Sequence, residues 1–519
     1  MEKKWWTLVV CSAATFMLLL DVTIVVVALP TIEKELHASF TDIQWVVDAY
    51  ALTLAAVLLT SGSLADRYGR RLLFTIGLAV FTAGSALCGA AQDPLMLIIS
   101  RAIQGIGGSI LFSTSLALIA QTFRGKDRGT AFGVWGAIAG AATGLGPLLG
   151  GAITTGISWR GIFLVNVPIG IAALILTRWK VDESRIPQAT LPDWAGFGTL
   201  TAGLIALVYG LIRAGETAWS DTGVIVCLCL AVLFLAAFVL IEARVATHPL
   251  FDLQLFRVPT FGGGLLAAFA MNGSLFAMFL YLVIYLQDDL GYSALGTGVR
   301  VMVVSGISLV VGAAAGRMSE HVPVRWLIGP GLVLVGLGLV VMDGITATSS
   351  WTHLLPGFIL AGIGSGLVNP PLASTAVGVV PPHQAGMASG VNSTFRQIGI
   401  ALGIAVYGTL FTSQVRSGLQ SNLAGTPSLA AQSPRIANAF TQGNASQVIG
   451  QTPADLRPTL LHAARTAFAD ALNNLVIISG TLALVAGVAT FFLIRSKDFV
   501  PRVADAEPAA TPSQAPAEA

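Results

Sequence analysis

Three ionisable residues interrupt long apolar runs, and they are the first candidates for chemistry. Asp21 lies in LLLDVTIVVVALP, Asp48 in QWVVDAYALT and Arg101 in ISRAIQGIGGSI. A charged side chain inside a bilayer is costly, so such residues commonly mark proton or substrate pathways. An acid that moves between a guanidinium and a site without one could take up and release a proton. At about 1.5 Å per residue from the ends of the apolar runs, all three are predicted to lie at a similar depth in the outer half of the membrane. We interpret Asp21, together with Asp48, as titrating residues and Arg101 as the residue that tunes them. The alternative is a static ion pair that holds three helices together.

The composition is that of a membrane protein with many spans. The chain has 519 residues, of which 55% are hydrophobic and only 10% charged, whereas a soluble domain has about a quarter charged residues. Because a span needs about 20 apolar residues, the sequence predicts an all-α integral membrane protein with about fourteen spans. The predicted spans are residues 5–30, 43–62, 72–92, 95–121, 130–154, 160–180, 194–213, 222–243, 261–286, 296–317, 325–345, 353–379, 386–412 and 468–495.

Basic residues mark alternate loops and so predict the orientation. One set of loops holds most of them, among them Lys3, Arg67, Arg128, Arg178, Arg244, Arg317 and Arg495, whereas the other short loops hold little beyond Lys34. The positive-inside rule then places both termini in the cytoplasm. We expect a multi-pass protein of the bacterial cytoplasmic (inner) membrane. The four cysteines all lie in apolar runs and are interpreted as small packing residues.

A charged turn between two spans carries the most specific pattern. Gly62–Arg71 reads GSLADRYGRR. Arginines alone are common in cytoplasmic loops, but they do not explain two glycines and an aspartate at this spacing. The pattern resembles the signature between helices 2 and 3 of the major facilitator superfamily of transporters. That resemblance implies a conformational latch, with Asp66 near the N-terminal end of span 11 and Arg70 paired with Asp127. The latch residues are Gly62, Asp66, Gly69, Arg70, Arg71 and Asp127.

The two halves of the chain repeat each other. RGTAFGVW at Arg128–Trp135 recurs as AGMASGVN at Ala385–Asn392, and GIGGS at Gly105–Ser109 recurs as GIGSG at Gly362–Gly366. Such internal repeats are common in transporters, and the resulting six, two and six spans resemble the fourteen-span drug:proton antiporter family of that superfamily. The expected domains are the N-terminal six-helix half at 1–180, two inserted spans with linkers at 181–258, the C-terminal six-helix half at 259–500 with a long extracellular loop at 413–467, and a disordered cytoplasmic tail at 501–519.

Span 5 contains GAIAGAATGLGPLLGGAI, which resembles the antiporter motif of the same family. The matching residues are Gly146, Pro147, Gly150 and Gly151. Small residues let membrane helices approach closely, and a proline inside a helix bends it. The resemblance implies export rather than uptake, and the alternative is generic close packing.

A substrate cavity is expected between the halves. It should be apolar and aromatic with one or two acids, which suits lipophilic or monocationic compounds. In the second half, Arg396 lies near mid-membrane, and Asn369-Pro370-Pro371 is expected to break span 12. Both a substrate role and a structural role stay open for these residues. The candidate cavity residues are Phe16, Tyr50, Phe276, Phe279, Tyr281, Tyr285, Asn369, Asn392 and Arg396.

Together these features predict a transporter and not an enzyme. The sequence contains no P-loop, no H-E-x-x-H motif and no nucleophile elbow. We expect a proton-coupled efflux antiporter that exports amphipathic or lipophilic drugs and antibiotics by alternating access. The alternatives are a dedicated exporter of one endogenous metabolite or antibiotic, which would give self-resistance, and a membrane receptor or scaffold that does not transport. The expected partners are an amphipathic small molecule, protons and the lipid bilayer; we expect a monomer, no cofactor, no metal and no nucleic acid.

Overall fold

The computed structural model describes residues 2–123, 125–184, 193–217, 219–244, 253–319, 321–380, 385–441 and 445–499. Within these ranges the regular elements are helices, and no strand occurs. Thirteen of these helices are long and apolar enough to cross a membrane, and α13 (Arg325–Val341) is a shorter apolar helix of 17 residues. The prediction of an all-helical membrane protein is confirmed, whereas the total of fourteen spans stays a prediction. The predicted tail at 501–519 lies outside the described residues.

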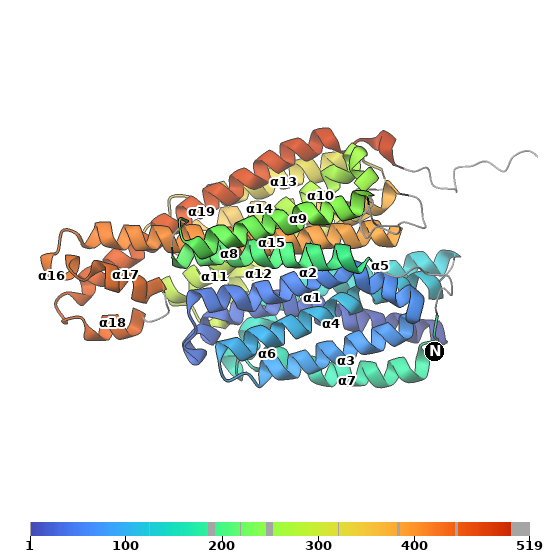
Figure 1. The fold of residues 1–519 in the computed structure, drawn as a ribbon, viewed down its shortest axis with the longest axis horizontal. Coiled ribbons are helices and arrows are strands. Elements are labelled where there is room, and N and C mark those ends of the chain that lie inside the picture. Colours follow the sequence, from blue (N-terminus) through green and yellow to red (C-terminus); the bar gives the residue numbers. More distant parts are fainter. Residues whose placement is uncertain are drawn as a thin grey trace, which may run out of the picture.

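A first bundle holds the three charged candidate residues (Figure 1). Its elements are α1 (Lys3–Leu36), α2 (Phe40–Tyr68), α3 (Arg70–Gly89), α4 (Pro94–Thr122), α5 (Gly125–Gly156), α6 (Gly161–Leu164) and α7 (Asn166–Lys180). Ser39 and Asp42 form a capping box at the start of α2, and Asp93 caps α4 immediately before Pro94. α4 packs against α1, α2 and α3, and α1 also packs against α5 and α7. Asp21 on α1 and Arg101 on α4 are therefore enclosed by other helices.

A second bundle and an inserted helix pair complete the fold (Figure 1). The bundle contains α10 (Pro259–Met271), η2 (Asn272–Phe276), α11 (Ala277–Ile284), η3 (Tyr285–Asp289), α12 (Ala294–Met318), α13, α14 (Leu355–Gly378), α15 (Ala385–Leu423) and α19 (Arg457–Leu493). The inserted pair is α8 (Trp194–Glu216) and α9 (Thr222–Arg244), and short 3-10 turns lie at η1 (Leu253–Arg257), η4 (Trp351–His353) and η6 (Ser496–Asp498). α8 packs against α9, α15 and α2, so the pair lies against the junction of the two bundles.

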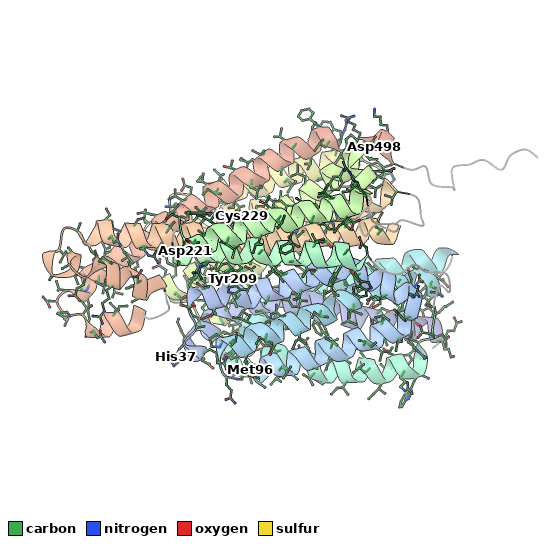
Figure 2. The ribbon with its side chains drawn as sticks, in the orientation of Figure 1. His37, Met96, Tyr209, Asp221, Cys229 and Asp498 are labelled. Carbon is green, nitrogen blue, oxygen red and sulfur yellow. The ribbon has the colours of Figure 1, made fainter. Side chains whose placement is uncertain are left out.

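The two bundles meet along α2 with α15 and along α5 with α12. We call the end of the molecule that carries the short helices α16 (Pro427–Ala430), α17 (Ser433–Thr441) and α18 (Ala445–Gln451) the outer end, and the end with the N-terminus the inner end (Figure 1). Figure 2 shows His37, which follows α1, toward the outer end and Asp498, which follows α19, at the inner end. Polar contacts join the bundles toward the outer end: Lys34 Nζ to Asp288 Oδ1 at 2.7 Å, Gln287 Nε2 to Val27 O at 2.7 Å and Gln44 Nε2 to Ile404 O at 3.1 Å.

The segment at 413–467, expected as a long extracellular loop, is largely helical. α15 runs for 39 residues to Leu423, which is about 58 Å of helix against about 30 Å of hydrocarbon. Val415, Leu419 and Leu423 recur at four-residue spacing and are buried, so α15 keeps an apolar face that packs on α19 beyond the membrane. The short helices α16 (Pro427–Ala430), α17 (Ser433–Thr441) and α18 (Ala445–Gln451) close this outer hairpin.

The expected break in span 12 is also absent. α14 is a continuous helix from Leu355 to Gly378 with Pro370 and Pro371 inside it. Prolines are tolerated within membrane helices because neighbouring groups satisfy the freed backbone atoms. Asn369 therefore presents its side chain from an intact helix.

Candidate functional site

An ion pair between α1 and α4 lies at the centre of the first bundle. Arg101 Nη1 donates to Asp21 Oδ2 at 2.5 Å, and the exposed fractions of the two side chains are 2% and 0%. The two residues were predicted to reach a similar depth, and the structure brings them into direct contact. A charged pair this deeply buried is costly unless its remaining hydrogen-bonding atoms are also satisfied.

Two amides, from α4 and α7, donate to the other oxygen of the Asp21 carboxylate, and a serine on α3 accepts from both amides. Gln104 Nε2 donates to Asp21 Oδ1 at 2.8 Å, and Asn166 Nδ2 donates to the same oxygen at 3.4 Å. Both amides also donate to Ser85 Oγ, at 2.7 and 3.1 Å. None of these three residues was predicted from the sequence. Gln104 could have been found because it follows Arg101 by three residues and so shares its helix face, whereas Asn166 and Ser85 carried no such signal.

The guanidinium of Arg101 is held from the α2 side as well. Its Nε donates to Val46 O at 3.1 Å, and its Nη1 also donates to Gln104 Oε1 at 2.7 Å. The ring of Tyr50 lies 4.1 Å from the guanidinium carbon, and the ring of Phe163 lies 5.8 Å from it. Tyr50 was predicted to line the substrate cavity, but here it forms part of the charged site. Arg101 thus keeps contacts with α2 that do not depend on the charge of Asp21.

Asp48 lies apart from this network. Its side chain has no exposed surface, and neither carboxylate oxygen has a hydrogen-bond partner among the residues that the structure describes. It sits one turn from Gln44 on α2, whose Nε2 donates to Ile404 O on α15 at 3.1 Å. Asp48 therefore belongs to the junction of α2 with the second bundle.

The glycines of the antiporter motif bring α5 close to two other helices. A Cβ atom on Gly146 would overlap Thr23 Oγ1, and one on Gly150 would lie 2.6 Å from Ile24 O, both on α1. A Cβ on Gly151 would lie 2.5 Å from Ala294 O on α12 of the second bundle. The backbone of Pro147 also borders α12, where a Cβ on Gly298 would overlap the Pro147 carbonyl oxygen. The motif therefore packs α5 against the helix that carries Asp21 and against the opposite bundle.

The predicted latch residues surround the turn between α2 and α3. Asp66 Oδ1 accepts from Arg70 Nε at 2.8 Å and Nη2 at 2.7 Å, and Arg70 also donates to Gln121. The expected Arg70–Asp127 pair is not formed in this structure, because Asp127 instead pairs with Lys4 Nζ at 3.0 Å. Gly69 has a φ of +125°, a conformation that favours glycine.

Backbone groups around this turn are also satisfied. The backbone N–H of Arg71 donates to Glu183 Oε1 at 3.0 Å. A Cβ on Gly62 would meet nothing within 4 Å. Both the Asp66–Arg70 contact and this backbone contact thus join residues of the first bundle.

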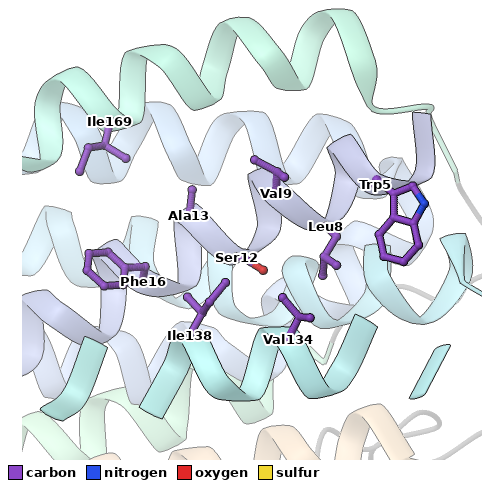
Figure 3. A pocket seen from close by; sticks show the side chains of 9 residues that line it. All are labelled: Trp5, Leu8, Val9, Ser12, Ala13, Phe16, Val134, Ile138 and Ile169. Carbon is purple, nitrogen blue, oxygen red and sulfur yellow. The ribbon is translucent and has the colours of Figure 1, made fainter. Parts of the chain in front are cut away.

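The remaining candidate cavity residues do not form one site. Phe16 lines a groove of about 770 Å³ between α1, α5 and α7, together with Trp5, Leu8, Val9, Ser12, Ala13, Val134, Ile138 and Ile169 (Figure 3). Tyr281 and Tyr285 are buried against α15 and α19, where their rings contact Phe411 and Phe468. The rings of Phe276 and Phe279 lie edge to face at 5.9 Å.

Arg396 lies between two amides of the second bundle. Its Nε donates to Asn392 Oδ1 at 3.3 Å, and its Nη1 approaches Asn369 Oδ1 at 3.5 Å. These three candidate residues are thus brought together by α14 and α15, in contrast to the aromatic ones.

Comparisons with known proteins agree with this architecture. The family model described as Major Facilitator Superfamily matches residues 11–404. The chain is 38% identical over 416 residues to the puromycin resistance protein of Streptomyces alboniger, covering 79% of this chain and 82% of that protein. It is 32% identical over 500 residues to the tetracenomycin C resistance and export protein of Streptomyces glaucescens, covering 94% and 91%. It is 35% identical over 422 residues to the multidrug resistance protein Stp of Mycobacterium tuberculosis, covering 80% and 78%.

Solved structures show the same fold at low sequence identity. A bacterial homologue of the human lysosomal transporter Spinster, in an inward-facing and unoccupied conformation, has a TM-score of 0.62 and 16% identity, covering 96% of this chain and 99% of that chain. The predictions of a multi-pass bacterial membrane protein and of a transporter family are confirmed. The chain belongs to the Major Facilitator Superfamily.

Proposed function

We propose that the protein is a proton-coupled efflux antiporter that exports amphipathic or lipophilic drugs and antibiotics by alternating access. The observation that carries the proposal is the fully buried Asp21–Arg101 pair, because an ionisable pair at this depth in a membrane protein commonly serves proton movement. Relatives named for resistance to puromycin, tetracenomycin C and multiple drugs support export of such compounds. The proposal includes fourteen spans, two cytoplasmic termini and a monomeric protein.

Protonation of Asp21 would change how α1 is held. The ionised carboxylate accepts from Arg101 and Gln104 on α4, and a proton on it removes the charge that attracts Arg101 and fills one acceptor site. Arg101 keeps its bond to Val46 O and its contact with the Tyr50 ring, so α1 is the helix that is released. A single charge that crosses 100 mV supplies about 2.3 kcal/mol, enough to support a useful substrate gradient.

Asp48 is the second proposed proton carrier. A carboxylate without a partner is costly in an apolar environment, and Asp48 has none among the described residues. We therefore assign it a proton in this conformation, in which α2 packs against α15. When the two bundles part, water would reach Asp48 and allow it to ionise.

The contacts between the bundles support a rocking cycle. The Lys34–Asp288 and Gln287–Val27 contacts hold the outer ends together in this structure. At the inner end, Arg70 of the same bundle donates to Asp66. We assign the proposed contact between Asp66 and span 11 to the other state of the cycle. The close approach of α5 to α1 and α12 at Gly146 and Gly151 provides a route from the charged site to the opposite bundle.

A dedicated exporter of one compound is the second candidate. It is favoured by the relatives that are named for a single antibiotic, puromycin or tetracenomycin C. The breadth of the exported compounds separates the two functions, since a dedicated exporter would leave a broad panel of lipophilic dyes unmoved.

The test measures the transport of fluorescent dyes into inverted membrane vesicles with an imposed pH gradient. In such vesicles an exporter moves dye from the medium into the lumen. Rhodamine 123, Hoechst 33342 and fluorescein form the panel, and a protonophore is added in a parallel run. We expect the protonophore to abolish wild-type transport. We expect the Asp21→Asn variant to insert in the membrane but to transport no dye.

The matched control is Asp182→Asn, because Asp182 is an exposed acid that pairs with Lys3. We expect this variant to transport at the wild-type rate. Wild-type transport that survives the protonophore, or full activity of Asp21→Asn, would contradict the proton-coupled mechanism.

A further inference from the structure

Arg396 is a guanidinium in the middle of the second bundle. It follows the start of α15 at Ala385 by 11 residues, which corresponds to a depth of roughly 17 Å in a hydrocarbon layer of about 30 Å. Asn369, which approaches it from α14, lies 9 residues before the inner end of that helix at Gly378. Both helices thus place these side chains near mid-membrane.

No acid neutralises Arg396 within the described part of the chain, where none of the ion pairs involves it. A guanidinium carries five N–H donors and cannot lose its charge in a protein. The contacts to Asn392 Oδ1 at 3.3 Å and Asn369 Oδ1 at 3.5 Å are long and engage only two of these donors. Arg101, the buried arginine of the first bundle, differs, because Asp21 compensates it.

The amides beside Arg396 add to this excess of donors. Asn392 is 4% exposed, and its Nδ2 has no hydrogen-bond partner among the described residues. Asn369 donates to Ser365 O at 3.1 Å, so its Oδ1 is turned toward Arg396. A buried donor without an acceptor is costly. The cluster therefore lacks an acceptor that carries negative charge.

The cluster lies close to the junction of the two bundles. Thr394, two residues before Arg396 on α15, donates to Ala55 O on α2 at 3.4 Å. A substrate that passes between the bundles would reach α15 here. The two acids buried within spans of the first bundle are not free to attract cations, because Asp21 is neutralised by Arg101 and Asp48 has no exposed surface.

We propose that Arg396, Asn392 and Asn369 form a subsite for an anionic oxygen group, a carboxylate or phenolate, on an otherwise apolar substrate. This inference rests on the proposed export function and names its substrate class. Charge-assisted bonds from a guanidinium to such a group are short and strong. The subsite therefore favours lipophilic acids over the monocationic compounds expected from the sequence.

The test is dye binding by fluorescence polarisation with purified full-length protein in detergent at pH 7.5. Fluorescein and rhodamine 123 share a xanthene scaffold and carry opposite charges. The variants are Arg396→Gln, which removes the charge, and Arg396→Lys, which keeps it. Arg300→Gln is the control, because Arg300 lies near the outer end of α12 and stacks on the Tyr292 ring at 3.5 Å. A monodisperse size-exclusion profile shows that each variant is folded.

We expect wild type to bind fluorescein more tightly than rhodamine 123. Arg396→Gln should weaken fluorescein binding at least tenfold, which is about 1.4 kcal/mol, and leave rhodamine 123 binding unchanged or tighter. Arg396→Lys should retain most of the fluorescein affinity, and Arg300→Gln should match wild type. Equal loss of both dyes in Arg396→Gln, or a wild-type preference for rhodamine 123, would overturn the proposal.

Transport in vesicles separates this inference from the proposed function. Gradient-driven rhodamine 123 export by Arg396→Gln at the wild-type rate, with no selective loss of fluorescein binding, would leave the antiporter standing and overturn the anion subsite. Selective loss of fluorescein binding with no gradient-driven transport by wild type would support the subsite and remove the antiporter.

Discussion

The buried Asp21–Arg101 pair leads us to expect that removing Asp21 costs more stability than removing Arg101. Removing one partner of a buried ion pair costs about 3–5 kcal/mol, because it leaves an uncompensated charge. Asp21→Asn leaves a guanidinium at 2% exposure, which cannot lose its proton. Arg101→Gln leaves a carboxyl group that can become neutral by binding a proton, so the cost falls toward that of lost hydrogen bonds, about 1–3 kcal/mol. We expect Asp21→Asn to be the more destabilising of the two.

The double variant Asp21→Asn/Arg101→Gln completes the cycle. It contains no buried charge, and the new amides can bond to each other and to Gln104. We expect it to be more stable than Asp21→Asn alone, with a coupling energy of about 1–3 kcal/mol. The free energy of unfolding is measured by SDS titration in mixed micelles.

The exposed Lys3–Asp182 pair provides the control for this cycle. Its side chains are 68% and 76% exposed, so Asp182→Asn should change the free energy of unfolding by less than about 1 kcal/mol. Equal costs for Asp21→Asn and Arg101→Gln, or a double variant whose cost is the sum of the two, would refute the reasoning.

Three further predictions concern helix contacts. Gly146→Val should lower transport in vesicles because its side chain overlaps α1, and wild-type activity would disprove the close packing. A reducible bis-thiosulfonate cross-link between Lys34→Cys and Asp288→Cys, with a spacer as long as the lysine side chain that bridges the native Nζ–Oδ1 contact of 2.7 Å, should stop transport until it is reduced; transport by the cross-linked variant would show that the outer ends need not part. Arg213 donates to Asp221 and holds its pKa below the usual range. This contact stabilises the protein above that range and is lost as the pH falls through the lowered pKa. Asp221→Asn should therefore lower the melting temperature at pH 7, and the difference should vanish only below the usual aspartate pKa of about 3.9; a difference that is independent of pH would contradict this.

The depth of a charged residue in the membrane could be predicted from the sequence, because depth follows from the number of residues along the helix axis. Asp21 and Arg101 were placed at similar depth by counting residues, and they form a pair. Asp48 was placed at the same depth but belongs to the junction with the second bundle. Depth does not determine which neighbour a helix face meets, so the count could not separate the two acids.

Contacts between loops and the folding of the outer hairpin were harder to predict. Arg70 was assigned to Asp127, but Asp66, four residues earlier on the other side of the Gly69 turn, takes the bond instead. Ser, Gln and Arg residues stand between the apolar residues Val415 and Leu419 of α15 in the sequence. Average polarity therefore indicated a loop where the four-residue spacing indicates a helix.

The central claim is that Asp21 exchanges a proton during substrate export. The most direct measurement places the purified protein in proteoliposomes with a pH-sensitive dye inside and a rhodamine 123 gradient as the only driving force. We expect wild type to move protons against the dye flux and Asp21→Asn to move none, while Asp182→Asn behaves as wild type. Dye flux through wild type without proton movement, or proton movement by Asp21→Asn at the wild-type rate, would contradict it.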